Sequence, residues 1–476
     1  MEFPTIKFVY FALITLTISW LLFQKRTVQK VFLLAASYYF AWQWKPLFLG
    51  VIVFSSLMNY GFGRALTAMR GHPRRQAVLT VGLVANLGVL GFFKYYGFFI
   101  ENLQNLTDLL GLSVHLPILE VLVPFGISFY TFQGMSYLVD THRDQAVQPE
   151  TLLDWMLFIS FFPQLGAGPI CRSHELLPQL HAPAPARIER LSEAVALIGT
   201  GLFKKMVMAT YLASHTTTDA FLFPKNWSTV ELVLATYAYT AQVYLDFSGY
   251  TDIARGVGLL FGFDIPENFN YPYRATNIGD FWRRWHITFS TWLRHYIYFP
   301  LGGSRKGKLR TYFNLMVTFV SCGIWHGASW GYIIWGGLHG IGLTVYKASL
   351  DIRRDLGMKA EGPWPWWWSV MGWFMTLSFC AFARIFFKTP DLVTAFDFWG
   401  VLFSFTGRGA GLDVGVLFLT LLTIFMNFYG RPVFDALVNL HDKIPAIARP
   451  VAWAAMMLAL FTLKPEGMAA TIYFSF

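Results

Sequence analysis

The chain has 476 residues, of which 55% are hydrophobic, 18% aromatic and only 13% charged, with a net charge of +10. Soluble globular domains carry about 25% charged residues, so this composition indicates an integral membrane protein. The basic residues occur in short clusters between apolar runs, which is typical of membrane topology and argues against a nucleic-acid-binding protein. The three cysteines are widely separated and form no CxxC pattern, so they imply neither a disulfide framework nor a metal site.

The first apolar run, at 8–23, has no strongly basic leader and is followed by three basic residues, Lys25, Arg26 and Lys30. This pattern predicts a retained membrane anchor with its N-terminus outside, and it differs from that of a cleaved signal peptide. Further apolar runs lie at 31–44, 46–62, 78–93, 121–139, 155–170, 366–386, 414–428 and 451–463. Their lengths predict an all-α membrane bundle of about ten to twelve spans or part-spans.

Two of these runs contain residues that interrupt helices, PFGISFYTFQG at 124–134 and FFPQLGAGPI at 161–170. An interruption at membrane depth is tolerated only where protein or a water-filled cavity satisfies the freed backbone groups. The two segments therefore predict broken or re-entrant helices that line a cavity, and an ordinary kinked span is the alternative for each.

Clusters of positive charge predict which segments face the cytoplasm. They lie at 25–30, 64–75, 204–205, 305–310 and 353–354. Because the last two clusters belong on the same side of the membrane, the segment between them must form a hairpin, which would hold His326 within the membrane. Continuing the same alternation, the C-terminal TIYFSF at 471–476 is expected on the extracytoplasmic side.

The run at 241–263 places Asp246, Asp252 and Arg255 in apolar surroundings. Asp252 and Arg255 are three residues apart, so they can pair on one helix. Asp246 has no such local partner, and an unpaired carboxylate at membrane depth is costly. We therefore expect Asp246 to meet a cation or a hydroxyl group from elsewhere and to line a tunnel wall.

The segment FWRRWHITFS at 281–290 follows Asn277 and Asp280, which favour the start of a helix. Helical spacing places an aromatic face beside a basic one. The aromatic residues are Phe281, Trp285, Phe289, Trp292 and Tyr296, and the basic residues are Arg283, Arg284 and Arg294. This predicts an interfacial amphipathic helix, whose arginines either anchor it to phosphate headgroups or bind a phosphorylated cofactor. For His286, a structural hydrogen bond competes with a role in an active site.

His326 lies in CGIWHGASW, between Trp325 and Trp330. A desolvated histidine remains neutral, and such a base can take a proton from a substrate hydroxyl. The alternative is a core histidine bonded to a carbonyl. His286, His295, His326 and His339 form no pair at the spacing of a helical metal site, so no bound metal is expected.

Several of these segments together resemble the membrane-bound O-acyltransferase family, in particular its bacterial branch of alginate and peptidoglycan O-acetyltransferase membrane subunits and the teichoic-acid D-alanylation protein. The segments that carry the resemblance are PFGISFYTFQ, FFPQLGAGPI, DFSGYTDIARG, FWRRWHITFSTWLRHYIYFPLGGSR and IWHGASWGYIIWGGLHG. The resemblance extends over the whole chain, with one departure at Gly166 and Ala167, where a larger residue is expected before the alanine.

The resemblance implies a single integral-membrane domain at 1–476, with helices around a tunnel and an extracytoplasmic aromatic tail at 468–476. It places the catalytic histidine at His326 and a second polar active-site position at His286. Tyr473 is a candidate acyl carrier, and Trp325 and Trp330 are expected to line the tunnel with Asp246. The basic residues expected to hold the phosphates of coenzyme A are Arg283, Arg284, Arg294, Arg305 and Lys306.

The function implied is acetyl transfer in the bacterial inner membrane from cytoplasmic acetyl-CoA, used as substrate with no permanently bound cofactor. The acetyl group would pass through Tyr473 or directly to a periplasmic SGNH-type acetyltransferase that modifies a polysaccharide. D-alanyl transfer of the teichoic-acid type is the alternative within the enzyme class. A transporter and a non-catalytic scaffold for the outer transferase are the alternatives outside it.

Overall fold

The structure, a computed structural model, describes residues 3–112, 114, 116, 119, 121–185, 187–359, 362, 364–405, 411 and 413–465. These residues are helical or irregular, and the described part of the chain contains no β-strand. The chain divides into two compact units. The N-terminal unit comprises Met1–Ala194 and Ile253–Pro266, and the C-terminal unit comprises Val195–Asp252 and Glu267–Phe476.

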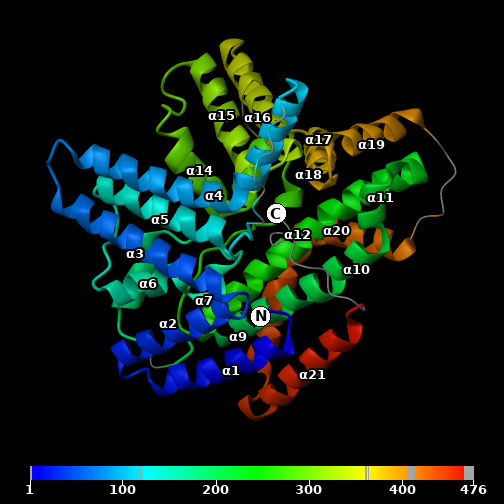
Figure 1. Ribbon diagram of the computed structural model, residues 1–476. Coiled ribbons are helices and arrows are strands. Elements are labelled where there is room, and N and C mark those ends of the chain that lie inside the picture. Colours follow the sequence, from blue (N-terminus) through cyan, green and yellow to red (C-terminus); the bar gives the residue numbers. More distant parts are fainter. Residues whose placement is uncertain are drawn as a thin grey trace. The chain divides into compact units, whose positions relative to one another are not determined.

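The N-terminal unit is a bundle in which α3 packs against α2, α4, α5 and α6 (Figure 1). Its helices are α1 (Ile6–Leu21), α2 (Arg26–Trp42), α3 (Pro46–Ala68), α4 (Arg75–Leu109), α5 (Ile127–His142), α6 (Leu152–Ser160), α7 (Phe162–Leu165) and α8 (Ser173–His181). Two further helices cross the boundary of the units, namely α9 (Leu191–Leu202) and α12 (Thr229–Leu260).

The C-terminal unit holds both histidines of interest, and several of its helices are short or irregular. After α9 come the π-helix η1 (Phe203–Ala209), α10 (Thr210–Leu212), the π-helix η2 (Ala213–Thr217), α11 (Thr218–Leu222) and η3 (Pro224–Asn226). After α12 come η4 (Pro272–Arg274), α13 (Ile278–Arg284), α14 (Ile287–Leu293), the π-helix η5 (Arg294–Tyr298), α15 (Lys308–His326) and α16 (Trp330–Asp355). The remaining helices are α17 (Trp366–Ala383), α18 (Ile385–Lys388), α19 (Leu392–Ser404), α20 (Val414–Lys443), η6 (Ala446–Ala448) and α21 (Arg449–Leu463).

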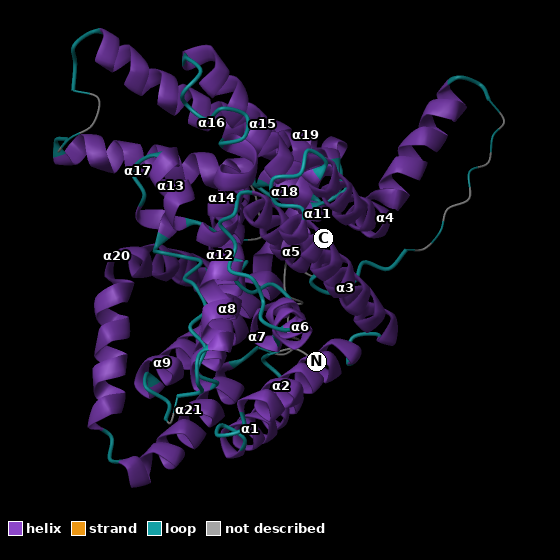
Figure 2. Ribbon diagram, turned by 90° about the vertical axis from the view of Figure 1, so that its left-hand side faces the viewer, coloured by secondary structure: helices purple, strands orange, loops and turns teal. Residues whose placement is uncertain are grey.

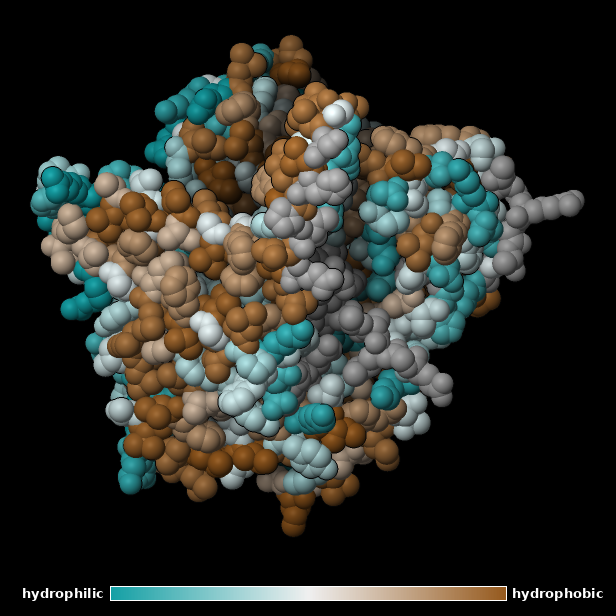
Figure 3. Space-filling view, viewed as in Figure 1, coloured by the Kyte–Doolittle hydropathy of each residue, from teal (hydrophilic) through white to brown (hydrophobic). Residues whose placement is uncertain are grey.

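Six helical segments of the described chain are long and apolar enough to cross a membrane, which confirms a multi-pass, all-α membrane protein. They are Pro46–Ala68, Arg75–Leu109, Leu191–His215, Trp366–Lys388, Val414–Lys443 and Ala446–Leu463. The third was missed in the sequence, because Lys204 and Lys205 interrupt its apolar run. Large apolar side chains are exposed along α4 and α21, and hydrophobic residues cover much of the face in Figure 3, as a lipid-facing surface requires.

The two predicted interruptions are present, and they meet inside the N-terminal unit. Gly126 adopts φ 74° immediately before α5, and the chain bends at Phe161 between α6 and α7. A Cβ atom at position 126 would lie 2.1 Å from the carbonyl oxygen of Leu165, so only glycine allows this approach. The two irregular segments therefore support one another through backbone contact.

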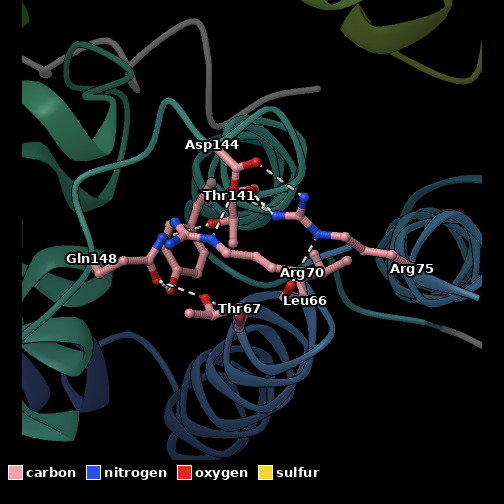
Figure 4. Close-up of polar contacts among 9 residues, drawn as sticks. Leu66, Thr67, Arg70, Arg75, Thr141, Asp144 and Gln148 are labelled. Carbon is pink, nitrogen blue, oxygen red and sulfur yellow. Dashed lines mark hydrogen bonds and ion pairs between the residues drawn. The ribbon is translucent and has the colours of Figure 1, made fainter. Parts of the chain in front are cut away.

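A guanidinium group joins α3, α4 and α5 at one end of this unit (Figure 4). Arg75 donates to the carbonyl oxygens of Leu66 at 3.0 Å and Thr141 at 2.7 Å, and it forms two hydrogen bonds with the Asp144 carboxylate. Arg70 donates to the same carboxylate at 2.9 Å. The hydrogen bond from Arg75 is the main cause that lowers the pKa of Asp144. Arg70 and Arg75 therefore connect the ends of these helices.

Three lysines that we assigned to cytoplasmic clusters form ion pairs within the fold. Lys30 lies 2.6 Å from Asp154 in the N-terminal unit, and Lys204 lies 2.6 Å from Asp252 in the C-terminal unit. Lys205 is buried and pairs with Asp246. Because their charges are compensated inside the protein, these lysines do not report which side of the membrane a segment faces.

The predicted hairpin between the two basic loops is formed by α15 and α16, which lie side by side (Figure 1 and Figure 2). Lys308 and Asp355 form an ion pair at its open end. Gly323 and Gly336 allow the helices to touch, since a Cβ at position 336 would lie 2.3 Å from the Phe319 carbonyl oxygen. Neither helix is among the six candidate spans of the described chain, so the depth of His326 in the membrane remains a prediction.

We predict that Gly336→Ala destabilises the protein by about 1–3 kcal/mol, because the added methyl group forces the two helices apart. Gly337→Ala is the matched control, since a Cβ there meets nothing within 4 Å and alanine favours a helix by up to about 1 kcal/mol. Thermal unfolding of the purified variants in the same detergent measures both effects. Equal stability of the two variants would contradict the close packing at position 336.

Candidate active site

The segment at 281–290 is not one continuous amphipathic helix, so that prediction was wrong. Helix α13 ends at Arg284 and α14 begins at Ile287, and between them His286 takes a left-handed conformation with φ 44°. Phe281, Trp285 and Phe289 are buried within the C-terminal unit and do not form an exposed membrane-anchoring face. The break turns the His286 side chain into the protein interior.

His286 is held by residues from two neighbouring segments. Its imidazole is 1% exposed and packs against Phe247 of α12 and Phe289 of α14, with ring centroids 4.8 and 4.9 Å away. Its Nδ1 lies 3.1 Å from Asn268 Oδ1. The backbone amide of Ile287 also donates to the Asn268 carbonyl at 2.9 Å, so residue 268 fixes both the side chain and the bend.

The hydrogen bonds of Asn268 determine the tautomer of His286. Asn268 Oδ1 accepts from the amide of Thr288 at 3.2 Å and from its hydroxyl at 3.0 Å, which identifies this amide atom as the oxygen. A carbonyl oxygen only accepts, so His286 Nδ1 must carry a proton and donate. The ring lone pair then lies on Nε2, which is the atom able to act as an acceptor or base.

His326 is the last residue of α15, and it lies within a cage of aromatic rings. Its side chain is 5% exposed. The imidazole meets Trp335 edge-on with centroids 5.0 Å apart, and Trp325 and Phe387 lie at 4.8 and 5.1 Å. These residues come from α15, α16 and α18. The cage encloses the histidine on several sides, so its ring lies in largely apolar surroundings.

Two aromatic rings contact both histidines. Phe289 and Trp325 pack together at 4.2 Å, and each ring contacts His286 and His326. A third imidazole, His339 on α16, lies 4.6 Å from Trp335 and accepts a hydrogen bond from Trp282 at 3.2 Å. The structure therefore gathers three histidines around shared aromatic neighbours.

Asp246 meets a cation from another helix, as expected. Its partner is the buried Lys205 of η1, and Gly249 allows this close approach because a Cβ there would lie 2.7 Å from the Gly201 carbonyl oxygen. The expected pairing of Asp252 with Arg255 was wrong. Asp252 pairs with Lys204, and Arg255 donates to the Ile265 carbonyl at 3.3 Å.

The basic residues expected to hold the phosphates of coenzyme A lie in different elements of the structure. Arg283 and Arg284 share Asp280 of their own helix, at 3.6 and 2.8 Å. Arg305 and Lys306 are exposed in the loop before α15. Arg294, at the start of η5, is also exposed and contacts the Thr291 hydroxyl at 3.3 Å.

Two further residues were predicted from the sequence to belong to the site, Trp330 as a tunnel-lining residue and Tyr473 as an acyl carrier. Trp330 begins α16 and is 54% exposed, whereas Trp325 is buried. Tyr473 and the tail at 468–476 lie outside the described residues.

Arg384 is a site residue that the sequence reasoning missed. It is 4% exposed, and its guanidinium lies over the ring of Trp285 at 4.8 Å, next to His286 in the chain. The one available signal was a charged residue near the end of the apolar run at 366–386, where burial of an arginine usually has a specific reason.

In the N-terminal unit, Glu150, Asp154 and His181 bring potential metal ligands within 4.8 Å of one another. Asp154 already accepts from Lys30 at 2.6 Å and from the Thr151 hydroxyl at 2.8 Å. A metal ion at this cluster would have to compete with the lysine.

Comparison with known proteins identifies relatives across this whole region. The model of the membrane-bound O-acyltransferase family matches residues 40–387, which include all three histidines and Arg384. A probable alginate O-acetylase of Pseudomonas putida is 34% identical over 94% of each chain, and a peptidoglycan O-acetyltransferase of Helicobacter pylori is 37% identical over 77% of this chain and 72% of its own. A teichoic acid D-alanyltransferase of Bacillus subtilis is 30% identical over 47% of this chain and 58% of its own.

We predict that Asn268→Ala lowers the free energy of unfolding by about 1–3 kcal/mol, because it removes the side-chain oxygen that accepts from the half-buried Thr288 amide and from His286 Nδ1–H. Asn226→Ala, at an exposed position of the same unit, is the control and should change stability little. Thermal unfolding in detergent compares the two. A stable Asn268→Ala variant would show that this amide does not hold the bend.

Proposed function

Because the chain belongs to the membrane-bound O-acyltransferase family, we propose that this O-acyltransferase uses acetyl-CoA from the cytoplasm and passes the acetyl group across the membrane. The receiving partner is a periplasmic SGNH-type acetyltransferase, which O-acetylates an exopolysaccharide of the alginate kind or a cell-wall glycan. The names of the relatives that match most of this chain, alginate O-acetylase and peptidoglycan O-acetyltransferase, support an acetyl group and a glycan.

The main support for a catalytic role of His326 is the aromatic cage that surrounds it at the end of α15. A neutral imidazole in this dry setting takes the proton from an attacking hydroxyl. The hydroxyl oxygen then forms a bond to the thioester carbonyl carbon, the carbon–sulfur bond breaks, and the thiol leaves with a proton. His286, whose lone pair lies on Nε2, is the second polar group beside Phe289 and Trp325.

The donor would be held by cations that are not committed to other residues. Arg284 is tied to Asp280 and to the Asn270 carbonyl, so it acts mainly within the fold. Arg305 and Lys306 are exposed, and among the described residues no carboxylate lies within 4 Å of either. Together with Arg294 they suit the phosphates of coenzyme A.

An acetyl group is favoured over a D-alanyl group by the extent of the matches. The teichoic acid D-alanyltransferase matches about half of this chain, whereas the alginate O-acetylase matches 94% of it. Transfer across the membrane requires a passage from the cytoplasmic loops to the outer face. The irregular segments at Gly126 and Phe161 are helix interruptions of the kind that accompany such passages.

We predict that His326→Ala lowers acetyl transfer by about 10²–10⁴-fold, because it removes the general base. The measurement is release of coenzyme A from labelled acetyl-CoA by the purified protein, together with acetylation of the polymer in cells. His215→Ala, at an exposed position of the same unit, is the control. Normal activity of a folded His326→Ala variant would refute the assignment, and transport of acetyl without thioester cleavage would favour a transporter.

Tyr473→Phe separates the two routes out of the enzyme. If the tyrosine carries the acetyl group as an ester, the variant loses polymer acetylation, because phenylalanine has no hydroxyl to acylate. If transfer to the partner is direct, polymer acetylation is unchanged. Mass analysis of the polymer distinguishes the outcomes, and a search for an acetyl group on the wild-type tail provides the second readout.

A further inference from the structure

Trp335 of α16 has a buried indole N–H group that donates to no atom of the described residues. The side chain is 4% exposed. An indole nitrogen is a donor only, and burying a donor without an acceptor is unfavourable. Other tryptophans of the protein meet this requirement, since Trp282 donates to His339 Nδ1 at 3.2 Å and Trp155 donates to the Ser56 carbonyl at 2.7 Å. The N–H of Trp335 is therefore available to a substrate atom.

This donor lies beside the proposed catalytic base. The rings of Trp335 and His326 meet edge-on, with their centroids 5.0 Å apart and their planes at 90°. The indole N–H does not donate to the imidazole. The close approach of α15 and α16 at Gly336, the next residue in the chain, brings the two side chains together. A base and an unused donor therefore share one aromatic cage.

Three further rings fix the position of the indole. His339 lies 4.6 Å from Trp335 between ring centroids, Phe387 lies at 5.2 Å, and Trp282 lies at 6.0 Å. These neighbours belong to α16, α18 and α13. A donor that is held in place in apolar surroundings does not have to reorient during a reaction, and its interaction with a developing negative charge is stronger there than in water.

We propose that the Trp335 N–H donates to the thioester carbonyl oxygen and stabilises the negative charge that develops on it. This inference rests on the proposed function. His326 takes the proton of the attacking hydroxyl, which belongs to Tyr473 or to the partner transferase. The hydroxyl oxygen bonds to the carbonyl carbon, and the π electrons of the carbonyl bond move onto its oxygen, where the indole donates. When the carbonyl bond forms again, the carbon–sulfur bond breaks and the thiolate takes the proton from the His326 imidazolium.

Two other donors lie near His326, and they are less well placed. Trp325 precedes His326 on α15, and neighbours in sequence do not share a face of a helix. The Tyr332 ring lies 6.5 Å from the His326 ring, compared with 5.0 Å for Trp335. Trp335 instead meets the histidine from the facing helix. Both alternatives are included in the test.

The first measurement is the rate of coenzyme A release from labelled acetyl-CoA by the purified full-length protein in nanodiscs. Trp335→Phe keeps an aromatic ring and removes the N–H. We expect this variant to lower kcat about 10²–10³-fold with little change in KM, as for the loss of one donor to an oxyanion. Trp399→Phe is the matched control and should keep the wild-type kcat. The Trp399 Nε1 is also buried without a partner among the described residues, but its ring contacts Phe382 and Phe403.

The second measurement does not depend on turnover. Acetyl-CoA labelled with ¹³C at the thioester carbonyl is bound to His326→Ala, and infrared difference spectroscopy records its carbonyl stretch. A hydrogen bond weakens the carbonyl bond, so the stretch should shift to a higher wavenumber when Trp335→Phe is added to His326→Ala. Binding of the thioester in this experiment also shows that the variants are folded.

The outcomes separate this inference from the proposed function. A wild-type kcat in Trp335→Phe, or a carbonyl stretch that is the same with and without the indole, would overturn the inference while wild-type turnover remains. A large loss of kcat in Trp325→Phe or Tyr332→Phe, with none in Trp335→Phe, would overturn it in favour of that residue. Absence of coenzyme A release by the wild type would instead refute the proposed function.

Discussion

The close approach of α15 and α16 at Gly323 and Gly336 is the constraint on which the site depends. Without side chains at these positions, the helix backbones touch, and His326 at the end of α15 meets Trp335 of α16 within 5.0 Å. The same hairpin provides His339 and the surface on which α18 packs. A wider separation would open the aromatic cage around the histidine.

A second constraint is the compensation of charge inside a largely apolar chain. Asp246, Asp252 and Asp154 each find a lysine, and Arg75 is shared between two carbonyls and a carboxylate. These pairs connect helices that are far apart in sequence. Against this pattern, the cations at 384 and 388 stand out, because contacts with aromatic rings replace the acidic partner.

Some features were predictable because they depend on local chemistry. Apolar runs, the irregular backbone at Gly126 and at Phe161, and the hairpin between two basic loops all follow from composition and spacing, and the structure confirms them. The cavity expected beside the two irregular segments stays a prediction. The need of Asp246 for a cation was also predictable, since no opposite charge lies at helical spacing from it. The prediction failed for the segment at 281–290, because the pattern of aromatic residues suits a continuous helix while Asn268 imposes a left-handed turn at His286.

The sequence by itself determined that this protein is a helical, multi-pass membrane protein with two histidines in apolar segments, because hydropathy and residue type act locally. Only the tertiary structure decided that Phe289 and Trp325 each contact both of those histidines and that Lys205 is the partner of Asp246. It also brought Arg384 onto Trp285, a residue 99 positions earlier in the chain. Such contacts join segments that are distant in the sequence, and sequence periodicity cannot predict them. They depend on how closely the helices pack and on where glycine permits two backbones to meet.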